Sequence, residues 1–222
     1  MMAAGEISPG TVRVGRPRDP AIDVAVLEAT LAALFSVGYT RLSLEDVARQ
    51  AGTTKPAIRR RWPGRSHLVL AALGSRLGAI KAPDTGCTLC DLDECLKLFA
   101  RAFRCISPDV LGPLLADCAG DPELRQTFMT TLFDPPRTAV QRTLARAYER
   151  GDLREEVDPA IVLDLLGSFV YYRVLFSHLP IDDREIEHAV ETLLRGVARD
   201  YKQLLEHSRR TSATSEMHSL HA

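Results

Sequence analysis

The sequence lacks the features that mark secreted and membrane-spanning proteins. No apolar run approaches the roughly 18 residues that a membrane helix requires, and the first twenty residues contain no apolar segment of a secretory signal. The five cysteines are an odd number, which argues against a full disulfide framework. We therefore expect a cytoplasmic protein without a membrane partner, in which most cysteines are buried free thiols.

Motifs of catalysis and of β-structure are also missing. The chain has no Gly-rich phosphate loop after a strand, no HExxH and no GxSxG. His178 and His188 flank a turn near Asp182 and Asp183, but such side chains at helix ends are usually solvated. Sustained alternation of apolar and polar residues is absent, as are Asn-Gly and Asp-Gly turns. We therefore predict an all-α fold with neither enzymatic activity nor a cofactor.

Charge is distributed unevenly along a chain whose net charge is only −1. Residues 1–80 carry eleven Lys or Arg against six Asp or Glu, a balance of +5. The remainder carries 17 against 23, a balance of −6. A basic first third joined to an acidic remainder indicates a nucleic-acid-binding module attached to a second domain.

Three helices are predicted in the basic third of the chain. Apolar spacings of four, three and four indicate one from Asp19 onward, which Gly38 stops. In LSLEDVARQAG, Ser43 is a good N-cap for an amphipathic helix of two turns. In GTTKPAIRRRWPGR, Pro56 fits the first turn of a third helix, and Pro63 ends it.

The second and third of these helices, joined by the tight turn AGTT, form a helix-turn-helix pattern. The first helix of such a pair braces the second, which fits the major groove of DNA. Ile58 and Trp62 are four residues apart and are predicted to face the domain core. The basic side chains of that helix then point outward, with Arg61 towards a flank: Lys55, Arg59 and Arg60. A solvated run of three arginines is the alternative, but the order and spacing of the helices favour DNA binding.

The segments GRPRD, LFSVGYTRLSLEDVARQAG and TTKPAIRRRWPGRSHLV, at about residues 16–80, resemble the DNA-binding domain of the TetR family of bacterial transcriptional regulators. Further along, the resemblance rests on the helix pattern and on phrases such as ARAYERGDLREEVDP and LLGSFVYYRVLF. It implies an N-terminal three-helix domain, a fourth helix leading into a larger helical ligand domain, and a homodimer. The role of repressor also follows from the family majority.

The resemblance further implies which residues meet DNA. Ser43 matches a hydroxyl position that usually contacts phosphate, and Arg65 matches a basic residue that does so at the start of the fourth helix. Arg16 and Arg18 lie in an arm that can reach the minor groove. The other predicted contacts are Thr53, Thr54, Lys55, Pro56, Ala57, Arg59, Arg60 and Arg61. The family most often has tyrosine in place of Arg59, so we expect the DNA contacts to depart from those of relatives there.

Four parts are predicted along the chain: a flexible basic arm at 1–18, the helix-turn-helix domain at 19–64, a helical ligand-binding and dimerisation domain at 65–206, and a disordered tail at 207–222. In the third part, residues 81–90 form a loop by composition. Helices are expected at about 91–105, 108–118, 121–149 (bent or broken by Pro135-Pro136), 159–178 and 183–206. The last two have more apolar surface than one core requires, so they are the predicted homodimer interface.

By family precedent, the second domain binds a small apolar ligand that changes the separation of two recognition helices. Because the half-sites of a palindromic operator lie ~34–36 Å apart, such a change weakens DNA binding. The expected partners are therefore double-stranded operator DNA, an unidentified small-molecule effector and a second copy of the chain. Candidate pocket residues are large and apolar: Phe99, Phe103, Phe128, Phe133, Tyr148, Phe169 and Tyr172. The alternative is that these aromatic residues belong to the core.

A second hypothesis rests on the cysteines. Cys87 and Cys90 have a spacing that zinc sites and redox thiols share, and Cys95 follows five residues later. No second Cys-x-x-Cys and no nearby histidine completes four ligands, so no metal site is predicted. A redox- or metal-responsive regulator is the alternative function, and an exposed loop with incidental cysteines is the simpler expectation.

Overall fold

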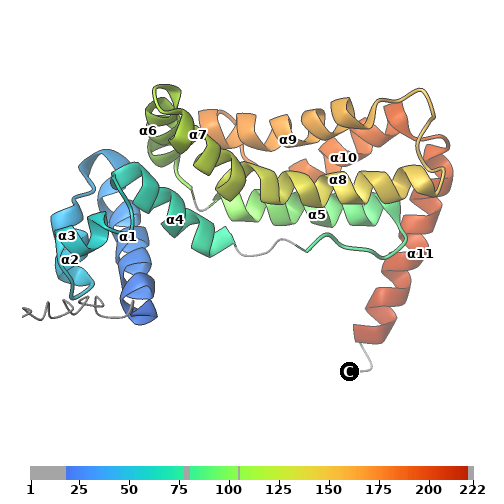
Figure 1. Cartoon of the computed structure of the whole chain (residues 1–222). Coiled ribbons are helices and arrows are strands. Elements are labelled where there is room, and N and C mark those ends of the chain that lie inside the picture. The colour runs from blue at the N-terminus through green and yellow to red at the C-terminus, as the bar shows by residue number, and fades with distance from the viewer. Residues whose placement is uncertain (1–18, 78–80, 105, 220–222) are drawn as a thin grey trace, which may run out of the picture.

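The structure, a computed structural model, describes residues 19–77, 81–104 and 106–219. The predicted basic arm, with Arg16 and Arg18, lies outside the described residues. Within them the chain is helical, and its only extended pairing is one isolated bridge between Leu153 and Ala198. Three N-terminal helices form one end of the molecule, and a longer helical bundle extends away from them (Figure 1). The all-α prediction is confirmed.

Local signals set the N-terminal helices, which are α1 (Pro20–Arg41), α2 (Leu44–Gln50), α3 (Lys55–Arg59) and α4 (Arg65–Leu77). Asp19 caps α1 by accepting a hydrogen bond from the backbone N–H of Ala21 (3.0 Å). Gly38 interrupts α1 with a φ of 75°, where glycine is favoured, so the predicted stop is confirmed although one more turn follows.

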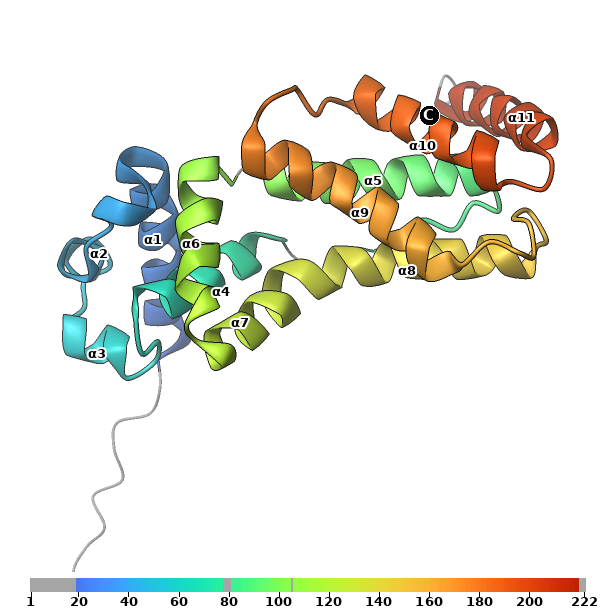
Figure 2. The same ribbon diagram turned by 90° about the horizontal axis from the view of Figure 1, so that it is seen from above.

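The bundle comprises helices from residue 88 onward. They are α5 (Thr88–Arg104), α6 (Pro108–Ala119), α7 (Pro122–Phe128), the π-helical segment η1 (Met129–Phe133), α8 (Asp134–Glu149), α9 (Pro159–Phe176), α10 (Asp183–Val197) and α11 (Tyr201–Ser219). Figure 2 shows α6 between α1 and the rest of the bundle, and α11 at the opposite end. The predicted interruption of the helix at 121–149 occurs as η1, with Pro135 and Pro136 in the first turn of α8.

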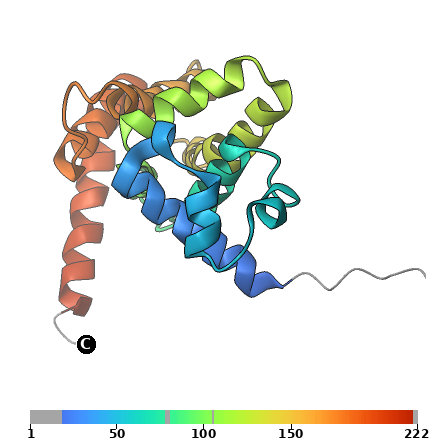
Figure 3. The same cartoon turned by 90° about the vertical axis from the view of Figure 1, so that its left-hand side faces the viewer.

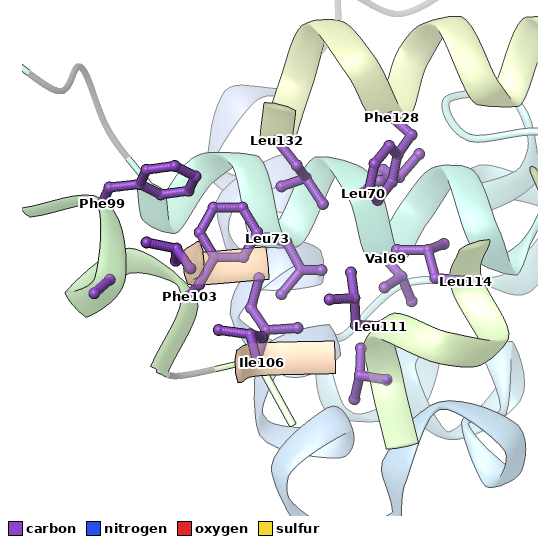
Figure 4. Packing of buried hydrophobic residues seen from close by; sticks show 14 of the residues in the cluster. Val69, Leu70, Leu73, Phe99, Phe103, Ile106, Leu111, Leu114, Phe128 and Leu132 are labelled. Carbon is purple, nitrogen blue, oxygen red and sulfur yellow. The ribbon is translucent and has the colours of Figure 1, made fainter. Parts of the chain in front are cut away.

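A continuous apolar core joins the two ends of the molecule. In Figure 4, α4 contributes buried Val69, Leu70 and Leu73, which lie among side chains of α5, α6, α7 and η1. Val69 and Leu70 are fully buried. Because α4 packs on α1 as well as on the bundle, it belongs to both ends of the molecule.

Three boundaries differ from the prediction. Helix α5 begins at Thr88, within the expected loop at 81–90. The helix expected at 183–206 breaks into α10 and α11, because residues 197–199 pair with 152–154 in extended backbone: Arg154 N–H donates to Val197 O (3.0 Å) and Arg199 N–H to Asp152 O (2.8 Å). The segment from residue 207, which was expected to be disordered, continues α11 as far as Ser219. Leu204, near the start of α11, is buried, and this helix packs against α5.

Two helices in the described residues, α1 and α9, are long and apolar enough to cross a membrane by length and composition alone. Both pack within the fold, α1 against α4 and α6 and α9 against α8. Core helices of soluble proteins pass the same test, so this finding is weak evidence for a membrane span.

Candidate functional site

The turn between α2 and α3 is built by small residues. Gly52 adopts a φ of 63°, which glycine accepts without strain, and Thr53 N–H donates to Ala48 O (2.9 Å). Thr54 then caps α3 by accepting from the backbone N–H of Ala57 (3.3 Å). This cap and the glycine turn fix where α3 starts relative to α2.

Two apolar side chains seat α3 on the core, as predicted. Ile58 is fully buried, and Trp62 is half-buried and packs against the core. The backbone N–H of Trp62 donates to Ile58 O (2.9 Å), so a turn continues beyond the end of α3. With Ile58 and Trp62 inward, the opposite face of α3 is presented to solvent at the end of the molecule seen in Figure 3.

The three consecutive arginines do not share one environment. Arg59 and Arg60 are exposed, and no ion pair holds either of them in the described part of the chain. Arg61 is only 12% exposed, and its Nε lies 2.5 Å from Asp23 Oδ1 on α1. The flank towards which Arg61 was predicted to point is therefore the interface between α3 and α1. There the Arg61 guanidinium stabilises the position of α3 and does not share the exposed surface on which Arg59 and Arg60 lie.

Two further residues that were predicted to contact DNA, Lys55 and Ser43, interact with side chains or backbone of α2. Lys55 forms an ion pair with Glu45, and this hydrogen bond is the main cause that lowers the pKa of Glu45. The Oγ of Ser43 accepts from the backbone N–H of Asp46 (3.3 Å), while its hydroxyl donates to Glu45 Oε2 (3.3 Å). Lys55 and Ser43 thus converge on one carboxylate at the start of α2.

Arg65 begins α4 and is held by its neighbours. Its guanidinium carbon lies 4.6 Å from the centre of the Tyr39 ring, a cation–π geometry, and its Nη1 donates to Thr40 O (3.1 Å). These contacts fix the guanidinium where the turn from Trp62 enters α4. Figure 1 shows α2, α3 and the start of α4 at the same end of the molecule, where the remaining predicted residues also lie: Thr53, Thr54, Pro56 and Ala57.

The bundle holds a cavity of about 610 Å³ between α5, α6, α8 and α9. Four of the seven predicted pocket residues line it, namely Phe99, Phe128, Phe133 and Tyr172. Most of the other lining residues are apolar, including Leu111, Leu115, Val140 and Leu163. A polar pair stands at its edge, where Arg137 Nη2 lies 3.2 Å from Asp164 Oδ1 and both side chains are partly exposed.

Three predicted pocket residues lie elsewhere. Phe103 is fully buried in the core, with its ring centre 5.1 Å from that of Tyr171. Tyr148 is exposed near the end of α8 and donates to Glu155 O (3.2 Å). Phe169 belongs to the opposite side of α9, beneath the guanidinium of Arg173 (5.0 Å) and next to α10.

The face of α9 in the cavity follows a four-residue repeat that sequence reasoning missed: Leu163, Gly167, Tyr171 and Leu175. Tyr171 stacks on Phe133 with ring centres 5.0 Å apart, and burial raises the pKa of its hydroxyl. At Gly167 a Cβ would meet no atom within 4 Å, so the missing side chain leaves open space in the cavity. A glycine amid large apolar residues at this spacing was the available signal.

Comparison with protein families identifies the fold and the two regions together. Residues 26–72 match the family described as bacterial regulatory proteins, tetR family, and residues 82–193 match the tetracyclin repressor-like, C-terminal domain. The chain belongs to the TetR family. It is therefore a DNA-binding transcriptional regulator of the helix-turn-helix type, and its relatives are named regulators and not enzymes.

Relatives of this TetR-family chain match it along most of their length. It is 25% identical over 184 residues to the HTH-type transcriptional regulator YdeS of Bacillus subtilis (strain 168), covering 82% of this chain and 93% of that protein. It is 28% identical over 172 residues to the DNA-binding transcriptional repressor TetR of Mycobacteroides abscessus, covering 77% and 90%. The crystal structure of the TetR family transcription regulator SCO0332 is 28% identical, with a TM-score of 0.62 and coverage of 79% and 98%.

The cysteines of this TetR-family regulator do not form one site. Cys87 and Cys90 are joined by a disulfide at the start of α5, and Cys87 is buried, unlike the exposed loop expected. Cys95 is a free buried thiol whose pKa is raised to about 11, chiefly by burial. Among the described residues, no group of three or more His, Cys, Asp or Glu side chains is placed to hold a metal ion.

Proposed function

We propose that this regulator is a cytoplasmic homodimeric repressor, which binds a palindromic operator through α3 and releases it when a small apolar molecule fills the cavity. The observation that carries the proposal is the pair of exposed arginines, Arg59 and Arg60, on a helix seated by Ile58 and Trp62. Arginine is the side chain best suited to bidentate contacts with guanine and to phosphate binding. One relative is itself named a DNA-binding transcriptional repressor, which supports that direction of control.

An apolar stripe on α9 supports the dimer. Ile161, Leu165, Tyr172 and Phe176 recur on one side of this helix, and each is more than half exposed. Next to the stripe, Phe169 and Leu193 line a groove between α9 and α10. A soluble protein rarely leaves so much contiguous apolar surface in water, and we infer that a second copy covers it through the same two helices, as a two-fold axis requires.

The dimer is tested by placing a charge in that stripe. Leu165→Glu should give the mass of a monomer in sedimentation equilibrium, because a carboxylate cannot be buried unpaired at an apolar interface. Val24→Glu is the matched control, since Val24 is an apolar residue of α1 that is exposed to a similar extent (55% against 53%). A Leu165→Glu protein that remains dimeric like the control would exclude this face.

The mode of DNA binding is tested by changing the spacing of the half-sites in the DNA that the purified protein selects. Inserting about 5 base pairs at the centre rotates one half-site by half a helical turn. A rigid dimer should then lose most of its affinity, whereas independent monomers would bind both DNAs equally. Equal binding would contradict a dimer that reads a palindrome.

The cavity as the effector site is tested with Gly167→Trp. The indole enters the open space beside Gly167, so compounds that bind there should raise the melting temperature of the parent more than that of the variant. Compounds that release the parent from its operator should belong to this group. If they stabilise both proteins equally, the effector binds elsewhere.

A further inference from the structure

Figure 2 shows helix α6 between α1 and the bundle helices α5 and α9. Leu111 and Leu115 of α6 line the cavity. Asp117 is two residues beyond Leu115, about 200° further around the helix axis, and contacts α1 and α4. One helix therefore has one side in the cavity and another against the start of α4.

Asp117 joins three helices through one carboxylate oxygen. Its Oδ2 accepts hydrogen bonds from the hydroxyl of Tyr39 on α1 and from the hydroxyl of Ser66 on α4 (2.6 Å). The two hydroxyl oxygens lie 2.8 Å apart, which closes a triangle. Tyr39 is only 1% exposed, so its hydroxyl meets Asp117 and Ser66 within the packed core and not in solvent. These hydrogen bonds, that of Ser66 first, lower the pKa of Asp117, so the carboxylate is charged at neutral pH.

The same triangle supports a predicted phosphate contact. Arg65 immediately precedes Ser66 and lies over the ring of Tyr39. The carbonyl that accepts from Arg65 belongs to Thr40, the residue after Tyr39. A displacement of Asp117 therefore moves both groups that hold the Arg65 guanidinium.

A second contact restricts how α6 can move. A Cβ built at Gly38 would lie 2.6 Å from Asp109 Oδ2, so the first turn of α6 packs directly on the backbone at the break in α1. With Asp109 near one end of α6 and Asp117 near the other, the helix touches α1 at two places. A shift of its cavity side, at Leu111 and Leu115, must therefore be carried to Tyr39 and Ser66.

We propose that Asp117 is a positioning residue that couples occupancy of the cavity to the DNA contacts, acting through the hydroxyls of Tyr39 and Ser66. The proposal rests on the function proposed above and assigns its regulation to three named side chains. In the unoccupied protein the triangle holds Arg65 in the geometry that meets phosphate. An occupant displaces α6, breaks the triangle and releases Arg65.

The coupling is tested without the natural effector, because Gly167→Trp carries its own occupant of the cavity. The dissociation constant for the selected operator is measured for the parent, Gly167→Trp, Tyr39→Phe and the double variant. Tyr39→Phe removes one hydroxyl, changes no charge and keeps the ring beneath Arg65. We expect Gly167→Trp to weaken operator binding about tenfold in the parent but less than about threefold in the Tyr39→Phe protein, within the range of known allosteric couplings.

Ser66→Ala should reduce the effect of Gly167→Trp in the same way. Tyr148→Phe, which removes a hydroxyl outside the triangle, should leave the full effect of Gly167→Trp intact. Asp117→Asn changes the charge near DNA, so Glu123→Gln, an exposed carboxylate on the neighbouring α7, is its control. If Gly167→Trp does not fold, Gly167→Leu fills the same space.

The outcomes separate this inference from the proposed function. Equal weakening by Gly167→Trp in the parent and in folded Tyr39→Phe would overturn the role of the triangle and leave release by the cavity standing. No weakening by Gly167→Trp in the parent would overturn release by the cavity, and the coupling with it. A structural role alone would lower the melting temperature of Tyr39→Phe without changing the ratio of the dissociation constants.

Discussion

The run Arg59-Arg60-Arg61 provides the sharpest prediction, because neighbouring substitutions should have different effects. Arg59 is exposed and no ion pair holds it in the described part of the chain, so Arg59→Ala removes only what the guanidinium does to DNA. A bidentate contact with guanine contributes ~1–3 kcal/mol. The dissociation constant for the operator should therefore rise by about 5- to 150-fold at an unchanged melting temperature.

Arg61→Ala should show the opposite pattern. Its guanidinium is 12% exposed and pairs with Asp23, whose side chain is 29% exposed, so the substitution leaves a largely buried carboxylate without this partner. For a partly buried pair we expect a loss of roughly 1–2 kcal/mol of unfolding free energy. In a protein of this size that corresponds to a melting temperature lower by about 2–8 °C, with the operator affinity of the folded protein within about threefold of the parent.

Both variants are measured by fluorescence anisotropy on labelled operator across a salt series and by thermal unfolding. An Arg59→Ala protein that binds like the parent at every salt concentration would contradict a DNA contact by this side chain. An Arg61→Ala protein that loses operator binding as strongly as Arg59→Ala, at an unchanged melting temperature, would contradict a bracing role for Arg61.

Three further predictions concern the rest of the chain. Gly38→Ala should lower the unfolding free energy by roughly 1–3 kcal/mol in urea, because φ is 75° and the new Cβ would meet Asp109; a parent-like midpoint would contradict this. Cys90→Ser should keep operator affinity within about twofold of the parent, with or without reductant, because the disulfide joins residues only three apart and constrains a single turn. A larger change in affinity would support the redox-responsive alternative. Burial and then Asp117 raise the pKa of Tyr39 to about 12. Its protonated form is thus favoured by folding, and the stability it adds is present below about pH 10 and lost as pH rises towards 12. Stability curves of Tyr39→Phe should lack that part of the alkaline loss, and identical curves would show that Tyr39 does not contribute.

The DNA-binding end could be predicted from the sequence because its signals are local. Asp19, Ser43 and Thr54 each cap a helix that starts at the next residue, and Gly38 and Gly52 adopt the positive φ angles that their turns need. The inward direction of Ile58 and Trp62 follows from a spacing of four residues. Each of these features depends on at most five consecutive residues, so it can be predicted without knowledge of tertiary contacts.

Features that depend on distant partners could not be predicted in the same way. Arg61 pairs with Asp23 on another helix, and no pattern near Arg61 distinguishes it from Arg59. The break between α10 and α11 arises from backbone pairing with residues 152–154. The cavity depends on which side of α9 faces α6 and α8. Phe99 and Phe133 line it, while Phe169, on the same helix as Tyr171, faces the other way.

Dimeric recognition of a palindrome through α3 is tested by in-vitro selection of DNA with the purified protein. Random duplexes are enriched through successive rounds of binding and sequenced, with the Arg59→Ala/Arg60→Ala double variant selected in parallel. The parent should enrich a palindrome whose half-site centres lie about one helical turn, ~34–36 Å, apart, and the double variant should not. A parent that enriches no sequence, or a site without two-fold symmetry, would contradict a dimeric regulator that reads its operator through α3.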